Sequence, residues 1–204
     1  MKKYELTTDS ITAFGVKLFR IKALISFGNV ESGELGGYIE KEENLSHNGN
    51  AWVFDNAWVY GDAWVSGNAE VSGNAEVYGD AKVSGNAQVY GDAWVYGNAE
   101  VSGNAEVYGD AKVSGNAQVY GDAWVYGNAQ VSCDADYATI KGFGSQYRNT
   151  TFFRTKENNV KVVCGCFYGT LEEFREKVKE THGESKLAKE YLMIADLIEY
   201  HFNR

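Results

Sequence analysis

A six-residue phrase, repeated without interruption, dominates the middle of this chain and restricts what the chain can fold into. Over residues 51–134 the phrase runs Ala, any residue, Val, Tyr or Ser, Gly, and Asn or Asp, through 14 units that vary only at the two ends. A six-residue period places residues i and i+6 on nearly opposite sides of an α-helix, so a helix cannot keep one face buried. Each unit therefore predicts a short strand and a Gly-Asn or Gly-Asp turn, and such units bury their apolar side only by stacking into a solenoid.

The alternation of side chains within each unit gives the array an inside and an outside. Ala and Val point to one side of the strand, and the residue between them points to the other. Val followed four residues later by Ala, as at Val59 and Ala63, resembles the signature of the hexapeptide-repeat superfamily. That resemblance implies a left-handed parallel β-helix with three units per coil, or about five coils in all. More loosely, residues 36–40 with 44–46 resemble the entry to the arrays of prophage-type hexapeptide-repeat proteins of unknown function.

The two flanking segments are expected to act as caps, because the open ends of a β-helix expose unpaired backbone. Residues 1–50 are predicted to form an N-terminal β cap, with a strand pair over residues 16–25 and a turn at residues 36–37. The array is assigned to residues 51–140, preceded by a degraded unit at 45–50. The absence of proline agrees with this, since nearly every strand residue has to donate a backbone hydrogen bond to a neighbouring coil.

Residues 141–204 are predicted to form a C-terminal ββαα cap domain. Two apolar stretches, at 151–154 and 160–163, predict a hairpin. Thr170 and Glu173 form a capping box that starts a helix, and a second amphipathic helix follows it. The expected fold is therefore mainly β, with a left-handed β-helix held between two caps.

The net charge of −9 lies entirely in the array. Residues 51–134 hold eleven acidic residues and two lysines, whereas the rest of the chain holds 17 acidic and 17 basic residues. Direct binding of nucleic acid is not expected, because phosphate binding needs clustered Lys and Arg. The sequence has no apolar run of membrane-spanning length, no apolar signal region and only three cysteines, so we expect a cytoplasmic protein without a membrane partner.

Outward residues 18 positions apart stack into columns if each coil holds three units. All five tryptophans occupy outward positions, although a first-coil belt of Trp52, Trp58 and Trp64 could instead lie under the N-terminal cap. Contiguous exposed aromatic area marks an interface, whereas tyrosine ladders also stabilise neighbouring strands by stacking alone. The candidate protein-contact residues are Tyr90, Tyr108, Tyr126, Trp94, Trp124, Glu106, Asp92 and Asp110.

No residue pattern predicts a catalytic site, a cofactor or a metal. The acyltransferases of the resembled superfamily use a coil-borne histidine as general base, and residues 51–134 contain no histidine. His47 precedes the array at a position equivalent to Val. Two interpretations of His47 stay open there: an inward, hydrogen-bonded side chain and a catalytic one. Cys164 and Cys166 lack the spacing of a zinc site, and on one strand both would face the core.

An internal duplication bears on function. Residues 69–98 and 99–128 are identical, and this step of five units moves every copied residue to a different face of a three-unit coil. A residue-specific site inside the array is therefore not expected, which leaves specificity to the caps or their junctions. The sequence predicts a non-enzymatic β-helical scaffold that binds a protein partner or a second copy of itself. One alternative is a phage-encoded inhibitor that acts as a DNA mimic on a nucleic-acid-binding defence protein, and another is a hexapeptide acyltransferase.

Overall fold

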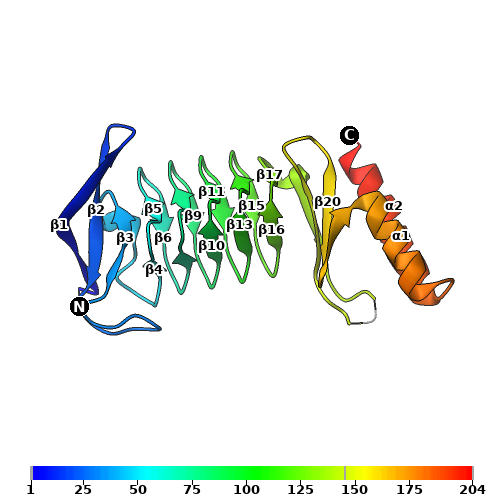
Figure 1. Cartoon of the computed structure of the whole chain (residues 1–204), viewed down its shortest axis with the longest axis horizontal. Helices are drawn as coiled ribbons and strands as arrows, with labels where there is room; N and C mark the ends of the chain where they lie inside the picture. Colours follow the sequence, from blue (N-terminus) through cyan, green and yellow to red (C-terminus); the bar gives the residue numbers. More distant parts are fainter. Residues whose placement is uncertain (1, 145, 204) are drawn as a thin grey trace.

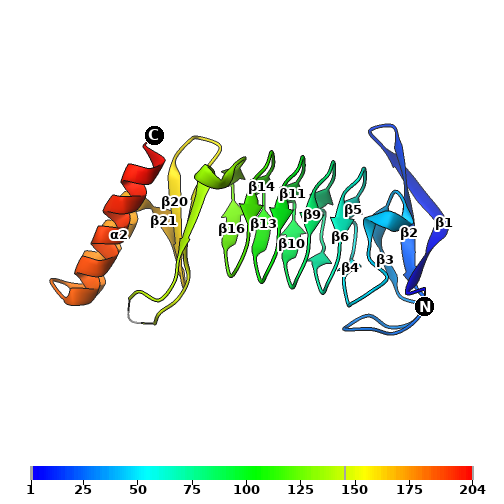
Figure 2. The same ribbon diagram turned by 180° about the vertical axis from the view of Figure 1, so that it is seen from behind.

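The computed structural model describes residues 2–144 and 146–203 and is elongated (Figure 1). A β-solenoid of about five turns forms the middle of the molecule. Antiparallel strands cover its N-terminal end, and an antiparallel sheet with two helices covers the other end. The two caps lie at opposite ends of the long axis, as the view from behind also shows (Figure 2). The mainly-β solenoid predicted from the hexads is confirmed.

Each hexad of the array contributes one short strand, and every third strand pairs in parallel. The strands are β4 (Trp52–Val53), β5 (Trp58–Val59), β6 (Trp64–Val65), β7 (Glu70–Val71), β8 (Glu76–Val77), β9 (Lys82–Val83), β10 (Gln88–Gly91), β11 (Trp94–Val95), β12 (Glu100–Val101), β13 (Glu106–Gly109), β14 (Lys112–Val113), β15 (Gln118–Val119), β16 (Trp124–Gly127) and β17 (Gln130–Val131). We name the three resulting sheets by the order in which the chain visits them. The first face is β4-β7-β10-β13-β16, the second is β5-β8-β11-β14-β17 and the third is β6-β9-β12-β15.

The interior of the array is built from two small residue types. The Ala and Val of all 14 units are at most 1% exposed, as the inside–outside alternation predicts. Neighbouring coils are in an 18-residue register, for example Val89 beside Val107. From Gly61 to Gly115 the turns stack in the same register and leave little room for a side chain. A Cβ on Gly103 would lie 2.8 Å from the backbone nitrogen of Gly121, and the φ of Gly103 is +74°.

The N-terminal cap extends the sheet of the second face. β1 (Tyr4–Ala13) pairs antiparallel with β2 (Val16–Ala23), and β2 pairs antiparallel with β3 (Leu35–Ile39). β3 then runs parallel to β5, which joins the cap to the first coil. The predicted strand pair within residues 16–25 is wrong, because this stretch supplies one strand whose antiparallel partner is the more polar β1.

The predicted turn at Gly36 and Gly37 is also wrong, since both glycines lie inside β3. A Cβ on Gly36 would lie 2.5 Å from the carbonyl oxygen of Val53, and one on Gly37 would lie 2.6 Å from that of Ala57. Close approach of the first coil, rather than a turn, therefore requires glycine here.

The unit before the array is offset by two residues from the expected register. Leu45 rather than His47 pairs with Val65 and is buried. The short 3-10 helix η1 (Glu42–Asn44) precedes it, and Asn44 Nδ2 donates to the carbonyl oxygens of two residues in the first coil, Gly61 at 3.0 Å and Ala63 at 2.8 Å. These bonds fix the chain so that Leu45 enters the core, and the assignment of His47 to a Val-equivalent position is wrong.

The first-coil tryptophans do not form a uniform belt. Trp52 is fully buried under the cap, where it packs edge-on against Phe27 with 5.4 Å between the ring centroids. Trp58 is half-buried, and Trp64 is 45% exposed. Of the two alternatives for the first-coil belt, burial under the cap therefore holds for Trp52 alone, whose outward position the cap covers.

The C-terminal cap is a four-stranded antiparallel sheet with two helices. Its elements are η2 (Asp134–Asp136), β18 (Tyr137–Ile140), β19 (Thr150–Arg154), β20 (Val160–Cys164), β21 (Phe167–Thr170), α1 (Leu171–His182) and α2 (Lys186–Phe202). The predicted ββαα order becomes ββββαα, because β18 and β21 are short and carry no clear apolar alternation. The predicted capping box is confirmed, with Glu173 N donating to Thr170 Oγ1 at 3.1 Å and Thr170 N donating to Glu173 Oε2 at 2.6 Å.

The C-terminal sheet has two buried faces. Phe152 and Val162 pack against the helices, whereas Phe153 and Val163 on the same two strands pack against the end of the array. The helices thus lie on the side of the sheet that faces away from the solenoid (Figure 1). In the described part of the chain, no helix combines the length and apolar character needed to cross a membrane.

Candidate functional site

Six of the eight predicted contact residues lie around one edge of the array, where the first face turns into the second. The last three coils each carry a tyrosine before the turn and an acidic or amide residue after it, whereas the first two carry Phe54 and Ser72 before the turn. We name this surface the Tyr–Asp edge; its residues are Tyr90, Tyr108, Tyr126, Asp92 and Asp110, with Trp94 beside them. Glu106 and Trp124 lie on the first face, two residues before the edge tyrosines Tyr108 and Tyr126.

The tyrosines of the edge form a stacked ladder that reaches the C-terminal cap. The ring centroids of Tyr90 and Tyr108 are 4.7 Å apart, and those of Tyr108 and Tyr126 are 4.6 Å apart. Tyr168 of β21 continues the stack at 4.7 Å from Tyr126. Burial raises the pKa of Tyr108 to about 12, and the neighbouring Tyr126 and Glu106 add to the shift. The ladder thus joins neighbouring coils by stacking and ties the array to the cap.

Glu106 supports this ladder from the first face. Tyr90 donates its hydroxyl proton to Glu106 Oε2 at 3.0 Å. Burial is the main cause that raises the pKa of Tyr90 above its usual range, and this hydrogen bond adds to the shift. Glu106 is therefore engaged by the ladder, which leaves only part of its carboxylate available to a partner.

Amide ladders at another edge show how the turns are held together. The side chain of Asn68 donates to Asn86 at 3.0 Å, Asn86 donates to Asn104 at 3.0 Å, and Asn104 donates to Asp122 at 2.9 Å. The bond from Asn104, together with the ion pair to Lys141, lowers the pKa of Asp122. This column ends with its negative charge compensated.

The corresponding column at the Tyr–Asp edge is interrupted by carboxylates. Asn74 Nδ2 donates to Asp92 Oδ1 at 3.0 Å, but the next residue in the column is Asp110, which also carries a carboxylate. Both side chains are exposed. Two carboxylates therefore stack on successive coils with no amide between them, and this edge offers uncompensated negative charge to the solvent.

An open groove of about 440 Å³ lies on the second face beside this edge, and we name it the Trp94 groove. It is lined by Asp92, Trp94, Asp110, Lys112, Asn128, Gln130 and Lys156. Lys112 Nζ lies 4.0 Å from the ring centroid of Trp94, within the range of a cation–π contact. Among the described residues, neither Lys112 nor Lys156 has a carboxylate within salt-bridge distance, unlike Lys82, which pairs with Glu100 at 3.1 Å.

The structure therefore brings together three of the predicted contact residues, Asp92, Trp94 and Asp110, and adds two cations. Lys112 could have been found from the sequence, since it lies 18 residues after Trp94 in the same column. Lys156 belongs to the turn between β19 and β20, and the hexad pattern says nothing about where that turn lies.

A second, more polar depression of about 290 Å³ adjoins the Trp94 groove and shares Lys112, Gln130 and Lys156 with it. Arg154 also lines it, and Arg154 Nε is paired with Asp136 at 3.2 Å. The unpaired positive charge of this depression therefore comes from the two lysines.

Trp124 belongs to a separate place on the surface. It lies on the first face, is 39% exposed and lines a cavity of about 220 Å³ together with Lys141, Arg148 and Asn149. Trp94 lies on the second face. The expectation that the duplication moves copied residues to different faces is confirmed for this pair.

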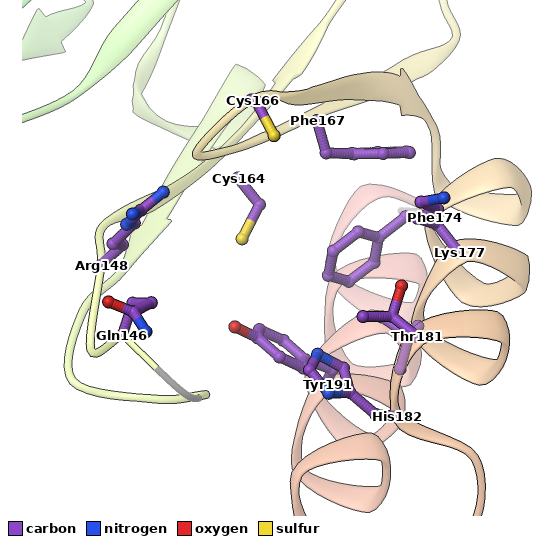
Figure 3. A pocket seen from close by; sticks show the side chains of 11 residues that line it. Gln146, Arg148, Cys164, Cys166, Phe167, Phe174, Lys177, Thr181, His182 and Tyr191 are labelled. Carbon is purple, nitrogen blue, oxygen red and sulfur yellow. The ribbon is translucent and has the colours of Figure 1, made fainter.

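A pocket that the sequence did not predict lies in the C-terminal cap. We name this cavity of about 290 Å³ the C-terminal pocket (Figure 3). It is lined by Gln146, Arg148, Cys164, Cys166, Phe167, Phe174, Lys177, Val178, Thr181, His182 and Tyr191. The expectation that the two cysteines face the core from one strand is wrong, because Cys164 ends β20, Gly165 turns with φ +61°, and Cys166 is exposed beyond the strand.

The three histidines all lie in the caps. His47 stacks on Tyr4 with 4.4 Å between the ring centroids, and its Nδ1 accepts a hydrogen bond from the backbone N–H of Lys3 at 3.3 Å. His182 is the last residue of α1, and His201 lies in the last turn of α2. The described residues contain no group of three or more His, Cys, Asp or Glu side chains placed to hold a metal ion.

Comparison with known protein families found a match that falls within the array. Residues 81–97, 87–103 and 117–132 match a family described as the YdcK β-solenoid repeat. The chain is thus similar to that repeat family over these residues, in agreement with the solenoid that the structure shows. A search of curated proteins found no match.

Proposed function

We propose that the protein is a non-enzymatic interaction protein and that its partner protein docks in the Trp94 groove, where the second face meets the C-terminal cap. The observation that carries the proposal is that one open groove gathers a tryptophan, two carboxylates on successive coils and two cations that have no carboxylate partner in the part of the chain that the structure describes. Tryptophan is enriched at interface hot spots, and complementary charges around it supply specificity and steer association.

The third face supports the proposal by contrast. Its outward column holds Lys82 and Glu100, which pair with each other. The residues after Val on three of its coils are serines rather than tyrosines: Ser66, Ser84 and Ser102. The middle coils of this face therefore offer a partner little uncompensated charge, and its exposed aromatic residues, Trp64 and Tyr120, lie apart at its two ends.

The charges of the groove define the partner chemistry. A carboxylate on the partner would meet Lys112 and Lys156, and a Lys or Arg on the partner would meet Asp92 and Asp110. An apolar or aromatic side chain would lie against Trp94. The proposed partner surface is therefore a mixed-charge patch around one apolar residue, rather than a basic groove of uniform sign.

Site-specific photocrosslinking in the native cell tests this proposal. A benzoylphenylalanine probe replaces Gln130, which is exposed and lines the groove, or Gln118, an exposed glutamine at the equivalent position of a hexad on the third face. We expect a discrete protein adduct from the Gln130 probe and none from the Gln118 probe. Equal adducts from both probes, or adducts from neither, would contradict a partner site in the groove.

The two lysines of the array supply a matched pair for measuring affinity with the partner recovered in this way. Lys112→Gln is expected to weaken binding about tenfold, because it removes an unpaired cation from the groove. Lys82→Gln removes the same charge from the third face and is expected to leave affinity unchanged. If the partner is a second copy of the protein, the protein self-associates. Light scattering that detects only monomer at high concentration would exclude this self-association.

A second candidate, mimicry of DNA, is favoured by the charge density of the array. Fourteen units at three per coil and about 4.8 Å per coil give a length of about 22 Å, so the net charge of −9 in the array amounts to about one charge per 2.5 Å. Double-stranded DNA carries about one charge per 1.7 Å, and each strand about one per 3.4 Å. Lys41 and Lys141 from the caps, which pair with Asp62 and Asp122, lower the density somewhat.

Competition separates the two candidates. A mimic occupies the nucleic-acid groove of its target, so duplex DNA should displace the protein, and binding should weaken steeply with salt. Neutral replacements at Asp92, Asp110 and Glu106 should then weaken binding together. If binding persists in excess DNA, the mimic is excluded and the mixed-charge partner, which also uses Asp92 and Asp110, is favoured.

A further inference from the structure

The C-terminal pocket has the form of a small-molecule site that is separate from the Trp94 groove. It lies among the end of β20, the turn into β21, the loop that contains Gln146 and Arg148, and one side of α1 and α2 (Figure 3). At about 290 Å³ it is close to the lower limit of ligand pockets, which range from about 300 to 1,000 Å³. A ligand with one ring and a short chain matches this volume.

One wall of the pocket is aromatic and apolar. The ring centroids of Phe167 and Phe174 are 5.5 Å apart, and those of Phe174 and Tyr191 are 5.7 Å apart with the rings nearly perpendicular. Val178, one turn after Phe174 on α1, completes this wall. Aromatic rings bind against such walls in offset or edge-on arrangements, so the wall favours a planar apolar group.

The opposite side of the pocket is polar, and the Tyr191 side chain reaches toward it from the aromatic wall. Its hydroxyl points across the pocket toward Cys164 and the loop (Figure 3). Burial raises the pKa of Tyr191, and the neighbouring Cys164 adds to the shift while Arg148 opposes it. A Cβ on Gly144 would collide with this hydroxyl, so glycine lets the loop pass close to the tyrosine. Thr150 Oγ1 donates to Cys164 Sγ at 3.2 Å, which holds the sulfur in place.

The charge of the pocket has one sign. Its charged and titratable lining residues are Arg148, Lys177, His182, Tyr191, Cys164 and Cys166, with no carboxylate among the lining residues described. Lys177 is already paired with Glu180 at 2.8 Å. Arg148 has no ion pair or hydrogen-bond partner among the described residues and lies on the loop side of the pocket, across from the phenylalanines (Figure 3).

We propose that this pocket binds a small aromatic carboxylate. The ring lies against Phe167 and Phe174, and the carboxylate accepts hydrogen bonds from the guanidinium of Arg148. A guanidinium presents paired N–H donors whose geometry matches a carboxylate, and this supplies the orientation of the ligand.

Protection of cysteines from alkylation tests the site on the full-length protein, with 3-phenylpropionate as the probe ligand. Cys164 and Cys166 line the pocket, whereas Cys133 is exposed outside it and serves as an internal reference. We expect 3-phenylpropionate to slow the reaction of N-ethylmaleimide with Cys164 and Cys166, measured for each cysteine by peptide mass spectrometry, and to leave Cys133 unchanged. No protection at saturating ligand, or equal protection of Cys133, would overturn the proposal.

Two variants and a neutral ligand test the assigned roles. Arg148→Gln should weaken 3-phenylpropionate about tenfold and leave 3-phenylpropanol unaffected, because only the acid needs the guanidinium. Lys179→Gln, which removes an exposed cation of α1 outside the pocket, should change neither. Thr181→Phe, at an exposed position that lines the pocket, should abolish protection by both ligands. Equal binding of the acid and the alcohol to the wild-type protein would overturn the role of Arg148.

Discussion

The array and the C-terminal cap bury apolar surface in opposite ways. The array repeats one pair of residues, and its Ala and Val columns leave at most 1% of any of these residues exposed. The cap mixes Phe, Val, Leu, Ile and Tyr on a sheet and two helices, and it leaves a pocket between them. Each of the four cavities described above includes at least one residue beyond residue 140.

This difference suggests where specificity arises in a repeat protein. Repetition of small residues produces a close-packed rod in which every coil resembles the next. Charges without partners and open aromatic rings collect where the repeat meets other elements, as at Lys112, Lys156 and Trp124. We therefore interpret the array as a rigid spacer that carries its sites at the junction with the cap.

The largest expected effect tests whether the two regions unfold independently. Phe152→Ala removes a fully buried ring from the core between sheet and helices and should destabilise the cap by about 3–5 kcal/mol. Because contacts in a solenoid are local, the coils far from the cap should keep their protection. Hydrogen exchange measured along the chain checks this, and simultaneous loss of protection in cap and array would show that they form one cooperative unit.

A glycine pair measures the cost of stacked turns inside the array. Gly103 and Gly121 have nearly the same positive φ, but a Cβ on Gly103 meets the next coil, whereas one on Gly121 has no neighbour within 4 Å in the described structure. Gly121→Ala should cost about 1 kcal/mol for its backbone conformation alone. Gly103→Ala should cost at least about 1–2 kcal/mol more. Equal losses in denaturant unfolding would show that turn stacking does not restrict these positions.

The amide ladder should contribute less than the turns. Asn86→Ala removes one donated and one accepted hydrogen bond, both at 3.0 Å on an exposed surface, and should cost about 1 kcal/mol. Asn56→Ala is the control, because this exposed asparagine has no side-chain hydrogen bond in the described structure. Equal destabilisation by the two substitutions would show that the hydrogen bonds of the ladder do not contribute to stability.

The tyrosine ladder should make the array sensitive to alkali, which is the smallest effect under ordinary conditions. Burial raises the pKa of Tyr108 from 10.0 to about 12, so the folded state retains a proton that the unfolded chain loses above pH 10. The contribution of Tyr108 to stability should therefore be constant below pH 10 and decline between pH 10 and 12. Tyr108→Phe should make that decline shallower, as followed by denaturant unfolding. An unchanged slope would contradict the raised pKa.

Sequence reasoning succeeded where a local pattern decides the structure. The hexads predicted the strands, the buried Ala and Val columns and the 18-residue register, because each depends on neighbours that repeat identically. It failed where contacts distant in the sequence decide. Gly36 is glycine because Val53 approaches it, and Trp52 is buried because the cap covers it. The Trp94 groove could be predicted in part, since Asp92 and Trp94 are close in sequence, but Lys156 comes from another element.

The central claim, that the array is a spacer and the partner binds at its junction with the cap, has one direct test. Deleting residues 69–86 removes one whole coil without changing the face of any remaining residue. With the partner identified by crosslinking, we expect this deletion to leave the Kd within about twofold, and Lys112→Gln in the same background to raise it about tenfold. If the deletion abolishes binding and Lys112→Gln has no effect, the account is contradicted.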